Sequence, residues 1–497
     1  VRAAVQIASC ELMVATVAAR ASWDSREFAS RISWDSRQWL RWERLLYASM
    51  QRPALGIALL AALLPCTLVA LPVMPLLSLA LLRCTPTPRG RHDVGIADVE
   101  QRLLSLPGPA PLARLRVFYP SKAERERPRA SWLPDGPARG RYATQHGFAL
   151  PLPRWATRFL APFLTSFLRL ARLPRRVSRL APPVAPTEAA AAAGWPLAVF
   201  SHGLWGCSAS YSGLCAELAS HGAVVIALEH GDGSAVYTET SDGEARVYGS
   251  VDGDDARARQ QRRRVAEARA VIDSIDEIAR QLPAGVAVDK SRLSLIGHSF
   301  GGSSVLRTAA DIASGRPRVS AGLVRAVVAC DPWISGYDET ADGVAPVPTL
   351  ALLTPSMMYP GNERKVGGVM RRLAQSSATA LYAEVRDTRH QEISDFPCIN
   401  HSPLRFFCMA GARPPAEAHA LQTSLVAGFL ALAGALDAPA GSELAAQREV
   451  ARGLFLAAEE PPPEESDYIV HGASLGAAAP PVPASPMALS APGGLAA

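Results

Sequence analysis

The most informative stretch of this sequence is SRLSLIGHSFGG, residues 291–302. Its apolar part, residues 293–296, predicts a buried strand, and the G-x-S-x-G pattern Gly297-His298-Ser299-Phe300-Gly301 follows that strand directly. In this context the serine lies on a sharp turn between a strand and a helix, where glycine lets two backbones pass closely. We therefore predict a nucleophilic Ser299 at the turn; the alternative is a tight turn without catalytic chemistry.

On both sides of this stretch, short apolar runs alternate with helical patterns. The runs are PLAVFSHG, AVVIALEHG, RAVVACDP and PTLALLTP. Residues 255–282 predict a long amphipathic helix, and its apolar face carries Val265, Ala268, Ile272, Ile275 and Leu282. Nearly continuous apolar strands that alternate with helices are typical of a parallel sheet covered by helices on both faces.

A serine hydroxyl is a weak nucleophile, so Ser299 needs a general base and a carboxylate that orients this base. His390 lies in the loop after LYAEVRDT, a strand of mixed polarity. We expect the base at that place, the carboxyl end of the last strand. His401 is the alternative base; without a catalytic role it is a surface-loop histidine near Pro397 and Pro403.

Asp331 is the expected carboxylate because it ends the apolar run at residues 327–330. A carboxylate at the end of a buried strand is costly unless it has a partner. The next strand, residues 349–353, has no acid close behind it. Asp338 and Asp387 are the alternative acids.

The order of Ser299, Asp331 and His390 along the chain is that of the α/β-hydrolases. We therefore predict an α/β-hydrolase fold over residues 95–432, with a mostly parallel central sheet and helices on both faces. Residues 174–193, rich in Arg, Pro and Ala, are expected to be a linker within it.

Acyl transfer also requires fixed N–H donors for the oxyanion. The backbone amide of Phe300, directly after the serine, is one expected donor. The second is expected from the loop Ser201-His202-Gly203-Leu204, where the glycine allows a turn and Leu204 is the preferred donor. We interpret His202 as a residue that braces this loop rather than as a catalytic residue.

Several segments together resemble the platelet-activating factor acetylhydrolase family, both its plasma and its intracellular type II enzymes. In chain order they are RVFYPSK, FSHGLWG, YSGLCAELASHGAVVIALEHGDGSA, LIGHSFGGSSVL, ACDPW and RHQEISDF. The resemblance covers about residues 95–430 and leaves both tails unmatched. It implies a calcium-independent serine esterase without cofactor or metal. Such an enzyme removes short or oxidised acyl groups from the sn-2 position of phospholipids through an acyl-enzyme.

Carried over one by one, the nucleophile of the family falls on Ser299, its acid on Asp331 and its base on His390. The oxyanion amides of the family fall on Leu204 and Phe300. The resemblance thus implies the same five residues that the motifs predict.

The sequence departs from the family pattern beside the expected site. Trp205 stands where a small residue is usual, and Gly231 stands where the family tends to carry Arg. The stretch between Ser299 and Asp331 is also longer than expected. These departures concern substrate identity more than reaction type. The alternative function is therefore a serine carboxylesterase or lipase for other esters, and a further one is a non-catalytic binding protein with the same fold.

The N-terminal region contains an unusual hydrophobic segment. Residues 53–82 are thirty residues without a charged side chain, and three prolines interrupt them. About 20 apolar residues suffice for a helix to cross the hydrocarbon core of a bilayer, and prolines kink such helices. We expect membrane association through one kinked span or a re-entrant segment. Residues 1–52, rich in Arg and Ser, are a candidate targeting segment.

The sequence also allows predictions for two more segments and for the cysteines. Residues 155–173 predict an amphipathic helix that faces either the core or a lipid interface. The Pro/Ala-rich stretch 459–497 is expected to be disordered. None of the eight cysteines forms a C-x-x-C pair, which argues against a zinc site. Cys207 and Cys215 are expected to be buried thiols, with a disulfide as the alternative.

The charge balance argues against nucleic acid as a partner. The chain has 497 residues and a formal net charge of +6, but only Lys122, Lys290 and Lys365 of its 51 basic residues are lysines. Such a skew towards arginine reflects coding bias, and no basic stripe is interleaved with aromatics. The expected partners are a phospholipid substrate and a membrane surface.

Overall fold

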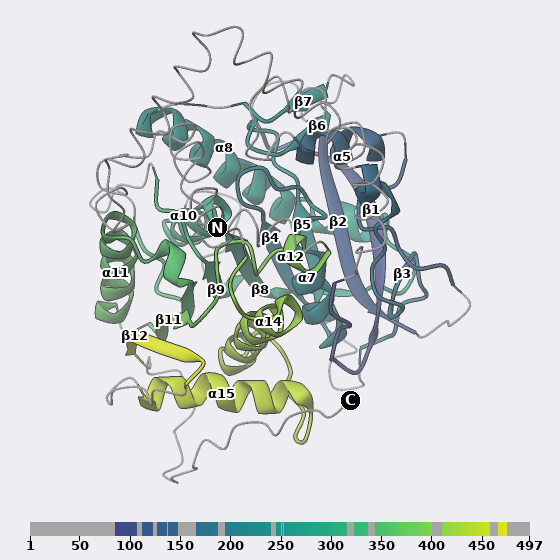
Figure 1. The fold of residues 1–497 in the computed structure, drawn as a ribbon. Coiled ribbons are helices and arrows are strands. Elements are labelled where there is room, and N and C mark those ends of the chain that lie inside the picture. The colour runs from purple at the N-terminus through teal and green to yellow at the C-terminus, as the bar shows by residue number, and fades with distance from the viewer. Residues whose placement is uncertain are drawn as a thin grey trace, which may run out of the picture.

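The computed structural model describes residues 85–106, 112–122, 127–136, 138–147, 166–186, 194–239, 245–249, 251, 253–315, 323–335, 343–376, 378–399, 410–457 and 466–474. These residues form a ten-stranded sheet with helices packed on it (Figure 1). The strand order is β12-β11-β10-β9-β8-β4-β5-β2-β1-β3.

The sheet is mostly parallel, as expected. Its strands are β1 (Asp93–Arg102), β2 (Leu112–Ser121), β3 (Val177–Arg179), β4 (Trp195–Ser201), β5 (Val224–Leu228), β8 (Val288–His298), β9 (Val324–Cys330), β10 (Thr349–Leu353), β11 (Ala380–Val385) and β12 (Tyr468–Ser474). From β5 across β4, β8, β9 and β10 to β11, each strand is parallel to its neighbours. β2 and β12 extend this parallel region with antiparallel pairings at either side. The four predicted apolar runs and the predicted elbow strand therefore all lie in the sheet, as β4, β5, β9, β10 and β8.

Helices bury both faces of the sheet. They are α5 (Arg139–Gly147), η1 (Ser166–Leu170), α7 (Ser212–Ser220), α8 (Asp254–Asp273), α9 (Ile275–Arg280), α10 (Phe300–Ala313), η3 (Pro355–Met357), α11 (Pro360–Gln375), α12 (Phe396–Ile399), α14 (Pro415–Leu432) and α15 (Glu443–Ala457). A separate two-stranded sheet pairs β6 (Tyr237–Glu239) with β7 (Ala245–Val247).

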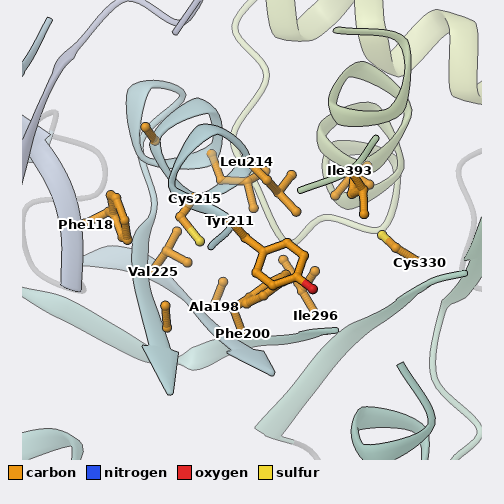
Figure 2. Packing of buried hydrophobic residues seen from close by; sticks show 14 of the residues in the cluster. Phe118, Ala198, Phe200, Tyr211, Leu214, Cys215, Val225, Ile296, Cys330 and Ile393 are labelled. Atoms are coloured by element: carbon orange, nitrogen blue, oxygen red, sulfur yellow. The ribbon is translucent and has the colours of Figure 1, made fainter. Parts of the chain in front are cut away.

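The alternation of side chains along β4 divides the core into two layers. Ala198 and Phe200 pack with residues of α7, α14 and α15, whereas Leu197 and Val199 pack with residues of α8, α9, α10 and α11. Figure 2 shows part of the first layer, where Phe200 lies in the same cluster as Leu214 of α7. Because both faces are covered, these strands contain almost only apolar residues, and their sequence signal is strong.

The expected helix over residues 255–282 is divided in two. Ser274 separates α8 from α9. The predicted apolar face is otherwise confirmed, because Ala268, Ile272, Ile275 and Leu282 are buried in the core, whereas Val265 is only partly buried. The part of α8 before Ala268 buries polar side chains, which the sequence did not predict. The buried polar residues are Arg257, Gln260, Gln261, Arg264 and Glu267. This face of α8 contacts the polar loops that follow β4 and β5, so its side chains meet hydrogen-bonding groups instead of the sheet.

The boundaries of the fold also differ from those expected. Part of the predicted linker at 174–193 is a strand, because β3 pairs in parallel with β1. Part of the tail expected to be disordered, 459–497, is also a strand, because β12 pairs with β11. The hydroxyl of Tyr468 donates to the carbonyl of Leu421 and anchors β12 to α14. Beyond residue 432, α15 lies along α14 and extends the fold (Figure 1).

The amphipathic segment at 155–173 is described only from Ser166 onwards. There it forms the short 3-10 helix η1, not a continuing α-helix. Leu168 is buried in the core, whereas Leu170 is exposed. The start of this segment lies outside the described residues.

The expected membrane segment at 53–82 and the candidate targeting segment at 1–52 likewise lie outside the described residues. Within the described part of the chain, no helix combines the length and the apolar character needed to cross a bilayer. Cys207 and Cys215 are separate buried thiols, as expected. Burial raises the pKa of the Cys207 thiol to about 12.

Candidate active site

Ser299 lies on the turn between β8 and α10, and its backbone has the strained angles φ 56° and ψ −120°. A side chain at Gly297 would overlap the backbone of Gly301, and one at Gly301 would overlap the carbonyl of Ser201. The two glycines therefore allow the strand, the turn and the helix to cross closely. The amide of Ser299 donates to the carbonyl of Cys330 at 2.9 Å, which ties the turn to the end of β9.

The structure brings Ser299, His390 and Asp331 together at the carboxyl ends of β8, β11 and β9. His390 Nε2 lies 2.9 Å from Ser299 Oγ, and His390 Nδ1 lies 3.1 Å from Asp331 Oδ2. A carboxylate only accepts hydrogen bonds, so Nδ1 carries the proton and Nε2 is available to accept the serine proton. This arrangement can activate a serine hydroxyl by general base catalysis.

Asp331 and His390 are each held by a second group. Both oxygens of the buried Asp331 carboxylate accept a hydrogen bond from Thr354, one from its amide and one from its hydroxyl. The amide of His390 donates to the hydroxyl of Ser356 at 3.0 Å. The side chain of His390 is 26% exposed, which leaves one side of the imidazole open to a substrate.

The alternative acids and base have different positions. Asp387 is near the end of β11, but its side chain is 74% exposed and lies 3.9 Å from Arg413, so it is not part of this cluster. Asp338 and His401 lie outside the described residues. Among the described carboxylates, Asp331 is the one within hydrogen-bonding distance of the imidazole of His390.

The loop after β4 passes directly beside the serine. A Cβ atom at Gly203 would lie 3.1 Å from Cβ of Ser299, so a larger residue there would crowd the nucleophile. Leu204 follows in this loop, and Phe300 begins α10. Among the described residues, no hydrogen bond uses the amide of Leu204 or of Phe300. Both amides are therefore available to an added acceptor.

Trp205, a departure noted in the sequence, has a positive φ of 62°. Its amide donates to the carbonyl of Ser234 at 3.0 Å. Its ring stacks on that of Tyr248, with centroids 4.1 Å apart and an interplanar angle of 22°. The large side chain is therefore held against residues 245–249 by a stacking contact beside the loop that carries Leu204.

A buried polar network that the sequence did not predict lies behind this loop. Arg264 of α8 donates to the carbonyl of His202 at 2.6 Å and to the hydroxyl of Ser234, and it pairs with Asp232 at 3.2 Å. His202 Nε2 accepts the amide of His230. Burial, together with the charge of Arg264, holds the pKa of His202 well below its usual range, so this histidine is neutral. His202 therefore braces the loop, as expected from the sequence.

The network also contains a buried hydrogen-bonded pair that the sequence signals only weakly. His230 bridges the hydroxyl of Ser201 and the carboxylate of Glu267. Arg257, Arg264 and Glu267 repeat at the spacing of one helical face, and counting polar as well as apolar periodicity would have found them.

His298, Asp331 and His390 also place potential metal-ligating atoms within 4.8 Å of one another. All three side chains already form hydrogen bonds: His298 with Tyr211 and the carbonyl of His390, and Asp331 with Thr354 and His390. The cluster therefore fits proton transfer better than metal coordination.

A mostly parallel sheet that holds serine, histidine and aspartate in series at its carboxyl edge defines the class of the α/β-hydrolases. A solved structure shares this fold: a ferulic acid esterase from Streptomyces cinnamoneus superposes with a TM-score of 0.52 at 20% identity, covering 72% of this chain and 97% of that chain. Within the class, the chain belongs to the family described as platelet-activating factor acetylhydrolase, isoform II, which matches residues 82–438.

Curated relatives agree with this family. The platelet-activating factor acetylhydrolase of Cavia porcellus is 26% identical over 336 residues, which are 63% of this chain and 69% of that protein. The protein of the same name from Canis lupus familiaris is 28% identical over 228 residues, 41% of this chain and 48% of that protein. The resemblance noted in the sequence is thus confirmed as family membership.

Proposed function

We propose that this chain is a calcium-independent serine esterase that hydrolyses short or oxidised sn-2 acyl groups of phospholipids. Membership of the acetylhydrolase family supports an esterase acting on such lipids. The observation that carries the proposal is the hydrogen-bonded series from Ser299 through His390 to Asp331.

In this proposal, Ser299 Oγ attacks the sn-2 carbonyl carbon while His390 Nε2 accepts the hydroxyl proton. Asp331 holds the imidazole in the required tautomer and stabilises the imidazolium that forms. The carbonyl oxygen, now an oxyanion, accepts hydrogen bonds from the amides of Leu204 and Phe300, typically a few kcal/mol per donor.

The tetrahedral intermediate then collapses. The bond to the sn-2 oxygen breaks, the lysophospholipid takes the proton from His390, and the acyl group stays on Ser299. A water molecule, deprotonated by the same imidazole, attacks the acyl-enzyme and releases the carboxylic acid. Ser299 regains its proton from His390, so protons and charge balance over one turnover.

The phospholipid substrate motivates the role that we assign to the N-terminal region. We propose that residues 53–82 associate with a membrane, as one kinked span or a re-entrant segment, and bring the esterase domain to a lipid surface. The uncharged, apolar composition of this segment supports this part of the proposal.

The test is release of the sn-2 acyl group from paired phosphocholines, acetyl against palmitoyl, without calcium, with wild type and Ser299→Ala. We expect rapid acetyl release by the wild type and none by a folded Ser299→Ala variant. Turnover by that variant would contradict the assignment of the nucleophile. Calcium-dependent release or equal rates for both acyl groups would contradict the substrate assignment.

One observation favours a second candidate, a serine carboxylesterase for other esters. Trp205 stands where the family usually has a small residue, two residues after Gly203 of the loop beside Ser299, and its ring stacks on Tyr248. Rapid cleavage of p-nitrophenyl acetate that depends on Ser299, with no turnover of any phospholipid, would favour this candidate.

A further inference from the structure

His298, the residue before the nucleophile, is buried and forms two hydrogen bonds that point in opposite directions. Its Nδ1 lies 2.8 Å from the hydroxyl of Tyr211, and its Nε2 lies 2.9 Å from the backbone carbonyl of His390. The hydroxyl of Tyr211 in turn accepts the amide of Gly203 at 3.2 Å. A continuous chain of hydrogen bonds thus connects the loop before Leu204 with the loop of His390. We call it the Tyr211–His298 bridge.

The chemistry of the partners decides which group donates and which accepts in each hydrogen bond of the bridge. The carbonyl of His390 can only accept, so His298 Nε2 carries a proton. Burial and the nearby His390 hold the pKa of His298 well below its usual range, so its Nδ1 is unprotonated and accepts the Tyr211 proton. The phenolic oxygen is then free to accept the amide of Gly203. No group in the bridge is left without a suitable partner.

The bridge passes close to the nucleophile. A Cβ atom at Gly203 would lie 3.1 Å from Cβ of Ser299, 3.1 Å from the Tyr211 hydroxyl and 3.3 Å from His298 Nδ1. The rings of His298 and His390 are 4.5 Å apart, and a neutral His298 does not repel the imidazolium that forms on His390.

The Tyr211 ring is fixed by the core. It packs against Phe200 of β4, with ring centroids 4.7 Å apart, and Figure 2 shows it beside Phe200 and Ile296. Tyr211 directly precedes α7 and is buried. The phenol therefore has little freedom to move when the substrate binds, and the distance between the two loops is set by rigid groups.

We infer that Tyr211 and His298 are positioning residues, which hold the oxyanion donor Leu204 and the base His390 at fixed places on either side of Ser299. The inference rests on the proposed esterase function. It predicts that breaking the bridge weakens stabilisation of the transition state while substrate binding is largely kept, because a displacement of about 1 Å can cost about 100-fold in rate.

The test uses the full-length protein and Tyr211→Phe, which keeps the ring and removes only the hydroxyl. We expect kcat to fall about 10- to 100-fold, with KM changed by less than about 3-fold. The affinity for a trifluoromethyl ketone, which forms a tetrahedral oxyanion on the serine, should fall by about the same factor as kcat/KM. Titration of the active sites with a fluorophosphonate corrects kcat and kcat/KM for any unfolded fraction.

Tyr119→Phe is the matched control. The Tyr119 hydroxyl is also buried and donates to a backbone carbonyl, that of Ala181 at 2.9 Å, but this bond joins β2 to the segment after β3 and is not part of the bridge. We expect kcat of this variant to stay within about 2-fold of wild type. Equal losses of kcat in Tyr211→Phe and Tyr119→Phe would overturn the inference.

His298→Gln provides a second, independent arm. A glutamine amide can still donate to the carbonyl of His390, but its Oε1 acceptor is on a flexible side chain and does not reproduce the fixed position of Nδ1, so the bond from Tyr211 is weakened. Because both substitutions affect the same hydrogen bond, the double variant should be no less active than the less active of the two single variants. Additive losses would overturn the inference, as would kcat within about 2-fold of wild type in both single variants.

The rates are measured on p-nitrophenyl acetate as well as on the acetyl phosphocholine, so that the two hypotheses fail differently. If no ester is cleaved in a reaction that depends on Ser299, both the proposed function and this inference are overturned. Turnover that depends on Ser299 but ignores Tyr211→Phe and His298→Gln would overturn the inference alone.

Discussion

Asp331 accepts two hydrogen bonds from Thr354, one from the backbone amide at 2.6 Å and one from the hydroxyl at 2.7 Å. Thr354 directly follows β10, the strand next to β9, so the neighbouring strand fixes the carboxylate that ends β9. The same Oδ2 atom that accepts the Thr354 hydroxyl faces His390 Nδ1. Sheet geometry therefore fixes the orientation of the base.

Asp331→Asn should lower kcat by about 10³- to 10⁴-fold, because an amide cannot hold the imidazole in the required tautomer. Thr354→Val, which removes only the hydroxyl donor, should cost about 10-fold. Steady-state kinetics on an acetyl ester measure both effects. Thr308→Val is the control, since its buried hydroxyl bonds only within α10. A mild effect of Asp331→Asn would instead direct attention to Asp338.

The residues of the candidate site could be predicted because each lies at or shortly after the carboxyl end of a predicted strand. Ser299 follows β8, Asp331 follows β9, and His390 follows β11 by a short loop. The carboxyl ends of parallel strands meet at one edge of the sheet, so three separate sequence signals converge on one site in space.

The supporting residues could not be predicted in the same way. Arg264 and Glu267 have the composition of a solvated helix face, and their burial depends on loops that are distant in the sequence. β12 is a short strand in a Pro/Ala-rich region, and its conformation depends on pairing with β11. The contact of Tyr211 with His298 likewise needs the tertiary fold.

Arg264 and Asp232 form a fully buried ion pair. Arg264→Met should lower the free energy of unfolding by about 3–5 kcal/mol, because it leaves a buried carboxylate without its partner. Urea unfolding followed by circular dichroism measures the loss. Lys290→Met removes the exposed pair with Asp276 and should cost no more than about 1 kcal/mol. Equal losses in the two variants would contradict the stabilising role of the Arg264 pair.

The lowered pKa of Glu217 should make the stability of the protein depend on pH. Burial raises the pKa of this carboxyl, but the hydrogen bond from His221 and the charge of Arg89 outweigh burial and lower it to about 2 from 4.5. A depressed pKa contributes stability above pH 4.5 that is lost as the pH falls towards 2. Above pH 4.5, the expected contribution of Glu217 to the free energy of unfolding is about 3 kcal/mol.

Urea unfolding of wild type and Glu217→Gln between pH 6 and pH 2.5 tests this expectation. The variant should be less stable at pH 6, and the difference should shrink as the pH falls, because protonation removes the same interaction in the wild type. Glu277→Gln, on an exposed part of α9, should follow the wild-type curve. A difference between wild type and Glu217→Gln that stays constant with pH would exclude this role.

Trp205 should influence the choice of acyl group, because it follows closely after Gly203, the loop residue beside Ser299. Its φ of 62° is a conformation that glycine adopts without strain, so Trp205→Gly removes the ring and keeps the loop. We expect the ratio of kcat/KM for hexanoyl over acetyl esters to rise about 10-fold. Competition between the two esters in one assay measures this ratio. An unchanged ratio would mean that the ring does not border the acyl site.

Removal of residues 1–84 should separate membrane binding from catalysis. The described fold begins at residue 85, and Arg89 forms its ion pair with Glu217 beyond the deletion. We therefore expect the truncated protein to fold and to cleave p-nitrophenyl acetate like the full chain. If residues 53–82 hold the protein on lipid, the full chain should float with phosphatidylcholine liposomes in a density gradient, whereas the truncated protein should stay at the bottom. Flotation of the truncated protein would contradict this role and assign the lipid contact to residues 155–173.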